Sequence, residues 1–188
     1  MTKLELWNFA LGCIPHGHRI VSDEENSTEA DYCRMFWDAS RVKILSTHNW
    51  TFATRSMECS EGLHRGVNGV HWVFPMPEGA VKVVGVFDQT GRQIEANGLD
   101  GLLVSHEPMG SLRYVIDIED PSSMPYLVQV AIAWDLAAQI APLITSGGIR
   151  LRQIAQQAAI ALGDARQADT GAVEGGGYSS THYADSRR

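Results

Sequence analysis

Two histidines near the start of the chain are the first side chains that suggest chemistry. His16 and His18 have the H-x-H spacing that some metal enzymes use, because alternate residues of a strand point the same way. Here they lie beside Pro15 and Gly17, and no carboxylate or third histidine follows at metal-ligand spacing. We therefore interpret them as loop residues and predict no metal site.

The cysteines support neither a disulfide framework nor a catalytic nucleophile. Cys13, Cys33 and Cys59 are an odd number and form no C-x-x-C pair. Cys33 falls within an apolar helical pattern, where a reduced buried thiol is the ordinary state. The sequence also contains no G-x-S-x-G segment, so nothing in it favours nucleophilic catalysis.

Acidic and glycine-rich segments lack the context of an active site or a nucleotide site. The acids at 23–25 and 117–120 fall in an expected polar loop and strand end, so we predict that they are solvated. The glycines at 98–101 and 175–177 lack the spacing of phosphate-binding loops, and we predict no cofactor. Two alternatives stay open: a small cytoplasmic hydrolase whose site is assembled by the fold, and a regulatory binding module.

The composition is that of a globular chain with an acidic balance. The 188 residues are 44% hydrophobic and 20% charged, which is enough to bury a sizeable core, and the net charge is -7. This charge disfavours strong sequence-independent binding of DNA. Residues 1–14 include Lys3 and Glu5 and lack the features of a signal peptide, so we expect the chain to stay in the cytoplasm where it is made.

Four helices are predicted from apolar spacing and from start and stop signals. The first covers about 4–11 and ends at Gly12, and the second covers about 29–47 after a cap at Ser27 or Thr28. The fourth follows two glycines and carries apolar residues at helical spacing as far as Ala165.

The third helix, about 126–145, is apolar almost all round. One side carries Leu127, Val130, Trp134 and Ala138, and the other carries Val128, Ile132, Leu136 and Ile140. Because a chain this short has one core to offer, we predict that the second side is covered by another subunit. A central helix enclosed by its own chain fits the periodicity equally well. Asp135 in mid-span would cost about 3 kcal/mol in a bilayer, which argues against a membrane helix.

Between the second and third helices the hydrophobic pattern changes to that of strands. Residues 81–87 are rich in valine and residues 112–118 alternate, with turn-forming segments at short intervals. The predicted fold class is α+β: an antiparallel helical bundle body, residues 1–52 and 121–170, carrying an inserted small antiparallel β-sheet subdomain, residues 53–120. The glycine-rich residues 171–188 are predicted to form a flexible C-terminal tail.

Five short segments, taken in order, carry a family resemblance. They are Leu6-Trp7-Asn8-Phe9-Ala10-Leu11-Gly12 followed by Ile20, Ser27-Thr28-Glu29-Ala30 and Cys33; Arg41 and Leu45 with His48-Asn49-Trp50-Thr51-Phe52-Ala53; Trp72-Val73-Phe74-Pro75-Met76-Pro77; Tyr114-Val115-Ile116-Asp117 with Asp120-Pro121; and residues 131–140, with Leu136-Ala137-Ala138, together with Ala165-Arg166. In this order they resemble the head-to-tail adaptor, or tail tubular protein A, family of short-tailed bacteriophages.

The resemblance implies a structural virion protein and no enzyme activity. It implies a connector ring of about twelve copies that docks on the portal protein, extends the channel for DNA ejection and supports the tail nozzle protein. Such a protein is made in the host cytoplasm and sits at the head-tail junction of the virion, with no membrane involved. DNA would pass through the lumen without specific binding, which suits an acidic chain.

The resemblance also makes the C-terminal end the portal-facing one. We therefore predict that Tyr178, Tyr183, Arg187 and Arg188 anchor the tail to the portal, and that the tail orders on docking.

Overall fold

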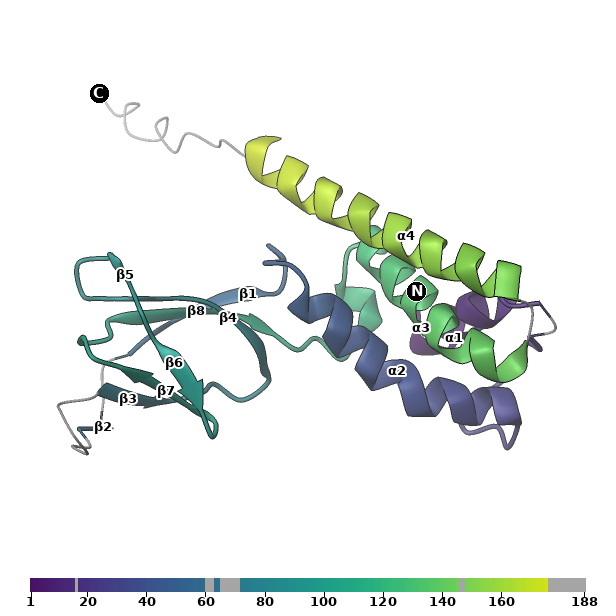
Figure 1. Ribbon diagram of the computed structural model, residues 1–188, viewed down its shortest axis with the longest axis horizontal. Helices are drawn as coiled ribbons and strands as arrows, with labels where there is room; N and C mark the ends of the chain where they lie inside the picture. Colours follow the sequence, from purple (N-terminus) through teal and green to yellow (C-terminus); the bar gives the residue numbers. More distant parts are fainter. Residues whose placement is uncertain (16, 60–62, 65–71, 146–147, 176–188) are drawn as a thin grey trace, which may run out of the picture.

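The computed structural model describes residues 1–188 except 16, 60–62, 65–71, 146–147 and 176–188. Two helices precede a run of short strands, and two more helices close the described chain (Figure 1). The elements are α1 (Lys3–Gly12), α2 (Thr28–Ser46), β1 (Thr54–Glu58), β2 (Leu63–His64), β3 (Trp72–Pro75), β4 (Ala80–Phe87), β5 (Gln93–Ile94), β6 (Asn97–Leu99), β7 (Leu102–Ser105), β8 (Ser111–Ile116), the 3-10 turn η1 (Pro121–Ser123), α3 (Tyr126–Ile144) and α4 (Gly148–Gly175). The mixed α+β class is therefore confirmed.

The first two helices begin at side-chain caps. Thr2 accepts a hydrogen bond from the backbone N–H of Glu5, and the Glu5 carboxylate accepts one from the N–H of Thr2. This capping box satisfies two N–H groups that the helix itself leaves unpaired. Ser27 caps α2 through the N–H of Ala30, which decides between the two predicted caps.

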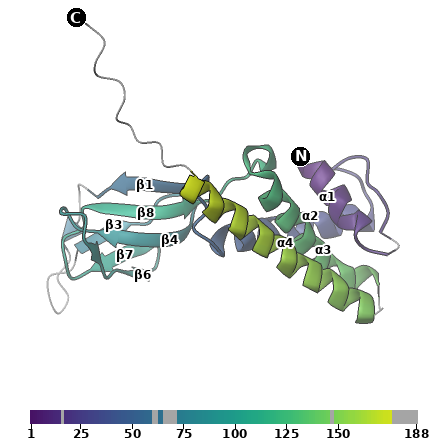
Figure 2. The ribbon, with the colours of Figure 1, turned by 90° about the horizontal axis from the view of Figure 1, so that it is seen from above.

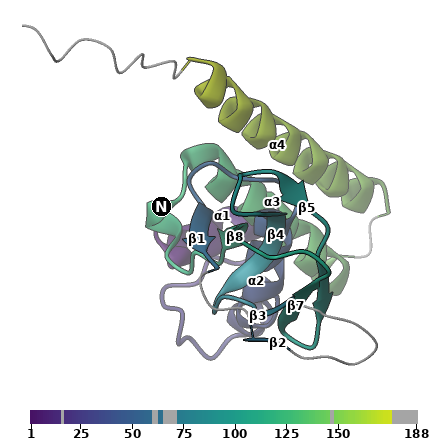
Figure 3. The same cartoon turned by 90° about the vertical axis from the view of Figure 1, so that its left-hand side faces the viewer.

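Helix α3 lies at the centre of the helical part. It packs against α1, α2 and α4, and α2 and α4 lie on opposite sides of it in two perpendicular views (Figures 1 and 3). The large core formed there contains the fully buried side chains Trp7, Leu45, Ile132 and Leu136. Burial of this apolar surface is the main stabilising contribution to the helical part.

Helix α3 is also the one helix in the described residues that is long and apolar enough to cross a membrane. More than half of its apolar window is buried inside the protein, against the three neighbouring helices. This packing accounts for its composition without a membrane.

The strands form two four-stranded sheets, where the sequence predicted one small sheet. Their orders are β1-β8-β4-β5 and β2-β3-β7-β6, and all neighbours are antiparallel. A second, smaller core lies between them, with Phe74 and Leu103 from one sheet facing Val86 and Leu112 from the other. Several strands are only two or three residues long, too short for alternation to reveal their partners.

Helix α4 is longer than predicted and runs along the helical part, ending on the side of the strand region (Figure 2). It continues to Gly175, five residues beyond the predicted end of the helical body at 170. The additional residues include Ala172 and Glu174, which are ordinary helix formers, and a glycine within a helix costs only about 1 kcal/mol relative to alanine. The remaining tail, residues 176–188, lies outside the described residues.

Candidate functional site

Two polar contacts join parts of the chain that are far apart in sequence, and the first is centred on Arg41. Its guanidinium, 6% exposed, donates to the carboxylates of Asp38, at 3.0 Å, and Asp117, and to the backbone oxygen of Ile118, at 3.3 Å. Arg41 comes from α2, whereas Asp117 directly follows β8. This contact therefore ties a helix to the end of the strand region across 76 residues of sequence.

Burial affects both partners of this ion pair. It raises the pKa of Asp117, and the neighbouring Arg41 guanidinium counteracts that rise only in part. In addition, Nε of Arg41 is buried and has no hydrogen-bond partner. An incompletely paired buried cation is costly, so this contact favours a particular arrangement more than it adds stability.

The second contact joins the end of α4 to the turn after α2. The Asp169 carboxylate accepts hydrogen bonds from the backbone N–H of Thr51, at 3.1 Å, and from its hydroxyl, at 3.2 Å. His48 Nε2 lies 3.2 Å from the same carboxylate, and Arg166 donates to the backbone oxygen of Thr47. Residues 47–51, an irregular turn, are thus held in place by α4.

His48, Asp169 and Thr51 do not have the arrangement of a catalytic triad. In a triad the histidine contacts both the hydroxyl nucleophile and the acid, and it carries a proton between them. Here it is the acid that contacts both other residues, and the Thr51 hydroxyl donates to the Asp169 carboxylate rather than to the imidazole. Three polar groups brought together by folding therefore give a structural contact.

A third polar group lies between α2 and α3. Asp135, which is nearly buried, accepts from Lys43 at 2.6 Å and from Gln139 at 2.8 Å, while Gln139 also donates to the hydroxyl of Ser40. These bonds satisfy the carboxylate that stands in the middle of the apolar helix α3. They fix how α2 and α3 are aligned lengthwise.

The predicted contact face of α3 is wrong for the folded subunit. Val128, Ile132, Leu136 and Ile140 are all at most 2% exposed and belong to the main core. The opposite side is the more accessible one: Leu127 is 38% exposed, and Trp134 is half-buried against Phe9. The reversal arises because α1, α2 and α4 together enclose the side that the sequence left for a partner.

The predicted tail contacts Tyr178, Tyr183, Arg187 and Arg188 lie outside the described residues, as does His16. His18 is exposed, and the structure brings no third ligand to it among the described residues. More widely, those residues contain no group of three or more His, Cys, Asp or Glu side chains that could hold a metal ion.

The three thiols are free and weakly acidic. Burial raises the pKa of Cys33 to about 12 and that of Cys13 to about 11, and it also raises the pKa of Cys59. Because the thiolate is the reactive form, none of the three is an activated nucleophile at neutral pH.

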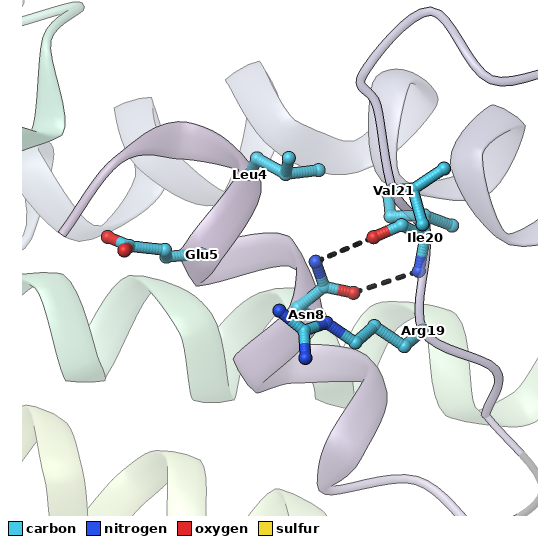
Figure 4. Close-up of a pocket in the computed structure, with 6 residues that line it drawn as sticks. All are labelled: Leu4, Glu5, Asn8, Arg19, Ile20 and Val21. Atoms are coloured by element: carbon cyan, nitrogen blue, oxygen red, sulfur yellow. Dashed lines mark hydrogen bonds between the residues drawn. The ribbon is translucent and has the colours of Figure 1, made fainter.

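A surface pocket of about 420 Å³ lies between α1 and the following loop (Figure 4). It is lined by Leu4, Glu5, Asn8, Arg19, Ile20 and Val21. The Asn8 side chain exchanges two hydrogen bonds, both 2.9 Å, with the backbone of Ile20, and Glu5 points away from the other lining residues. The Asn8 hydrogen bonds therefore hold the loop to α1. With Asn8 occupied in this way, the main polar group left for a ligand is the Arg19 guanidinium.

Comparison with protein-family models gives no match, and comparison with curated proteins gives none. The function must therefore be inferred from the residues of this chain.

Proposed function

We propose that this protein is a structural subunit of the ring that joins the portal to the tail of a short-tailed bacteriophage. In this role about twelve copies extend the portal channel and support the tail nozzle. The body that docks is the helical bundle, residues 1–52 and 121–170, and the strand region, residues 53–120, projects from it as a subdomain.

One observation carries the proposal: segments of the resemblance that are far apart in sequence lie in contact in the structure. Arg41 of the second segment contacts Asp117 of the fourth. The 48–53 stretch of the second segment also contacts Asp169 of α4, which follows the Ala165-Arg166 pair of the fifth but is not itself part of the resemblance. Unrelated chance matches would not be expected to coincide with the contacts that hold two parts of a molecule together.

The charge of the chain supports the same role. With a net charge of -7, a subunit around a DNA channel offers few groups that would displace counterions from phosphates. DNA then slides past at low affinity. The hydrolase alternative would need a site assembled by the fold, and the group of His48, Asp169 and Thr51 lacks the order of contacts of a hydrolase triad.

The direct test uses the portal and nozzle proteins encoded in the same genome. The purified chain is mixed with portal-bearing heads, and attachment is followed by electron microscopy and by the mass of the complex. We expect a ring on the portal that then recruits the nozzle protein. Failure to bind either protein, under conditions where the two are themselves folded, would contradict the proposal.

The C-terminal tail gives a second arm of this test. A chain that ends after Gly175 keeps the whole of α4 and loses the tail contacts Tyr178, Tyr183, Arg187 and Arg188. We expect it to fold normally but to attach poorly to the portal, because many weak tail contacts act together in a ring. A matched control carries a flexible extension after Arg188 and should attach normally.

A further inference from the structure

A line of uncharged residues runs along the outer face of α4. Ile149, Gln153, Gln156, Ile160, Gly163 and Gln167 recur at alternating intervals of four and three residues, and all six are exposed. This alternation is the spacing of the contact line of a coiled coil. None of the six is charged, and the two isoleucines are 69% and 46% exposed. We call this set the α4 seam.

The α4 seam is not used in packing the subunit. The residues of α4 that enter the core, among them Ile154, Ala161 and Ala165, lie on its other side. At Gly163 an added Cβ would meet nothing within 4 Å, so the surface there is open. An uncharged line of exposed residues along five turns is unusual for a helix face whose only neighbour is water.

Helix α2 carries a line of residues with the same spacing, the α2 seam, of which Tyr32 packs partly against the main core. It consists of Thr28, Tyr32, Met35, Ala39, Val42 and Ser46, with the same intervals of four, three, four, three and four residues. None is charged. Met35 is 67% exposed and Ala39 is exposed, whereas Tyr32, Val42 and Ser46 are half-buried.

The side chains of the two seams are complementary in size when the helices are placed side by side in the same direction. Ile160 then comes level with the small Ala39, and Val42 comes level with Gly163. A large residue faces a small one in both layers, which is the arrangement that fills space between two helices. Pairing either seam with itself in the same direction would give no such match.

Charge favours the same direction. Arg150 and Arg152 lie in the first turns of α4, and no acid occurs between 148 and 163. The start of α2 carries Glu29 and Asp31, and three further acids precede it at 23–25. A parallel pairing of α4 with α2 thus brings a basic end to an acidic end.

Because α3 separates α2 from α4 within one subunit, this pairing can occur only between two molecules. Helices α2 and α4 lie on opposite sides of α3 and start at the same end of the molecule (Figures 1 and 3). Their outer faces cannot meet within one chain. A contact between two different faces of one subunit repeats from copy to copy, and it closes into a ring when the rotation allows.

We propose that the α4 seam of one copy packs in parallel on the α2 seam of a second copy of this chain. This inference rests on the proposed function and deepens it, because it names the contact that builds the ring.

Disulfide cross-linking tests the register. A chain with both Ala39→Cys and Ile160→Cys is oxidised at pH 8, where the native thiols, with raised pKa values, compete little. We expect a ladder of covalent multimers from the double variant and none from either single variant. Dimers from Ile160→Cys alone would show α4 pairing with α4 and overturn the proposal. So would the absence of cross-links in the double variant.

Assembly in solution is the second measurement. By sedimentation, Ile160→Glu should raise the concentration needed for self-association by about tenfold or more, because it places a charge in the contact. The control is Leu102→Glu, at an exposed apolar residue of β7 remote from both seams, which should assemble like the wild type. A wild-type chain that stays monomeric at every soluble concentration would overturn the inference, as would an Ile160→Glu variant that assembles normally.

These outcomes separate the inference from the proposed function. Rings that depend on both seams but never bind portal-bearing heads would contradict the proposed function and support the contact between α4 and α2. If the Ile160→Glu variant attaches to the portal like the wild type, the contact between α4 and α2 is contradicted and the proposed function is supported.

Discussion

The guanidinium of Arg41 is bonded to the carboxylate of Asp117, and this pair links α2 to the segment that leaves the strand region. Arg41 is nearly buried, whereas the Asp117 side chain is 21% exposed and can still reach solvent. The pair therefore connects the two parts of the molecule at the point where the chain passes from strands back to helices.

Arg41→Met should destabilise the protein by about 2 kcal/mol at neutral pH, because it leaves Asp117 partly buried without a counter-charge. The value is below that of a fully buried pair because Asp117 is partly hydrated. Urea denaturation measures the change. Asp38→Asn is the matched control: it removes the partner of Arg41 that is 77% exposed and should have a small effect.

The same variant should have a characteristic pH dependence. The pKa of Asp117 is raised in the folded protein, so the folded chain holds this proton to higher pH than the unfolded chain. Its contribution to stability is therefore fully present below the ordinary Asp pKa and is lost as pH rises through the folded value. Loss of Arg41 raises the folded pKa further, so the deficit of Arg41→Met should shrink in acid. A deficit that is the same at every pH would contradict this explanation.

Asp169→Ala should release the end of α4 from the turn at Thr51. We expect faster amide exchange in the last turns of α4 and at Thr51, with a loss of about 1 kcal/mol in overall stability. Asp164→Ala serves as the control, since it removes an exposed carboxylate from the same helix. Equal exchange rates in the two variants would show that Asp169 does not hold the helix end.

Ile132→Asp should prevent folding. Ile132 is completely buried between α3 and its neighbours, and an unpaired carboxylate there costs more than about 4 kcal/mol. Ile160→Asp on α4 introduces the same side chain at a half-exposed position and should leave the fold intact. Circular dichroism and limited proteolysis distinguish the two. A folded Ile132→Asp chain would be incompatible with the core described above.

Gly110→Ala should destabilise the strand region by about 1 to 3 kcal/mol. Gly110 exchanges backbone hydrogen bonds with Phe87 and Cys59, and an added Cβ would lie 2.6 Å from backbone atoms of Asp88. The backbone at Gly110 cannot move away from Asp88 without breaking these hydrogen bonds. Gly98→Ala is the control, because a Cβ there meets nothing within 4 Å. Thermal unfolding of the two variants gives the comparison.

The four helices and their order could be predicted from local features of the sequence. The predicted starts and ends of α1, α2 and α3 agree with the structure to within one or two residues. This is possible because caps, helix-ending glycines and apolar spacing act within a few residues of each other. The longer strands β4 and β8 were predicted for the same reason, since valine-rich and alternating segments are local features.

Which face of α3 is buried depends on how the helices pack together and could not be predicted from the sequence. Both of its sides are apolar, so periodicity gives no preference, and three enclosing helices make Val128, Ile132, Leu136 and Ile140 core residues. The contacts of Arg41 with Asp117 and of Thr51 with Asp169 span 76 and 118 residues of sequence. No local pattern encodes such pairings, because the partners are brought together by the packing of elements that each form independently of the other.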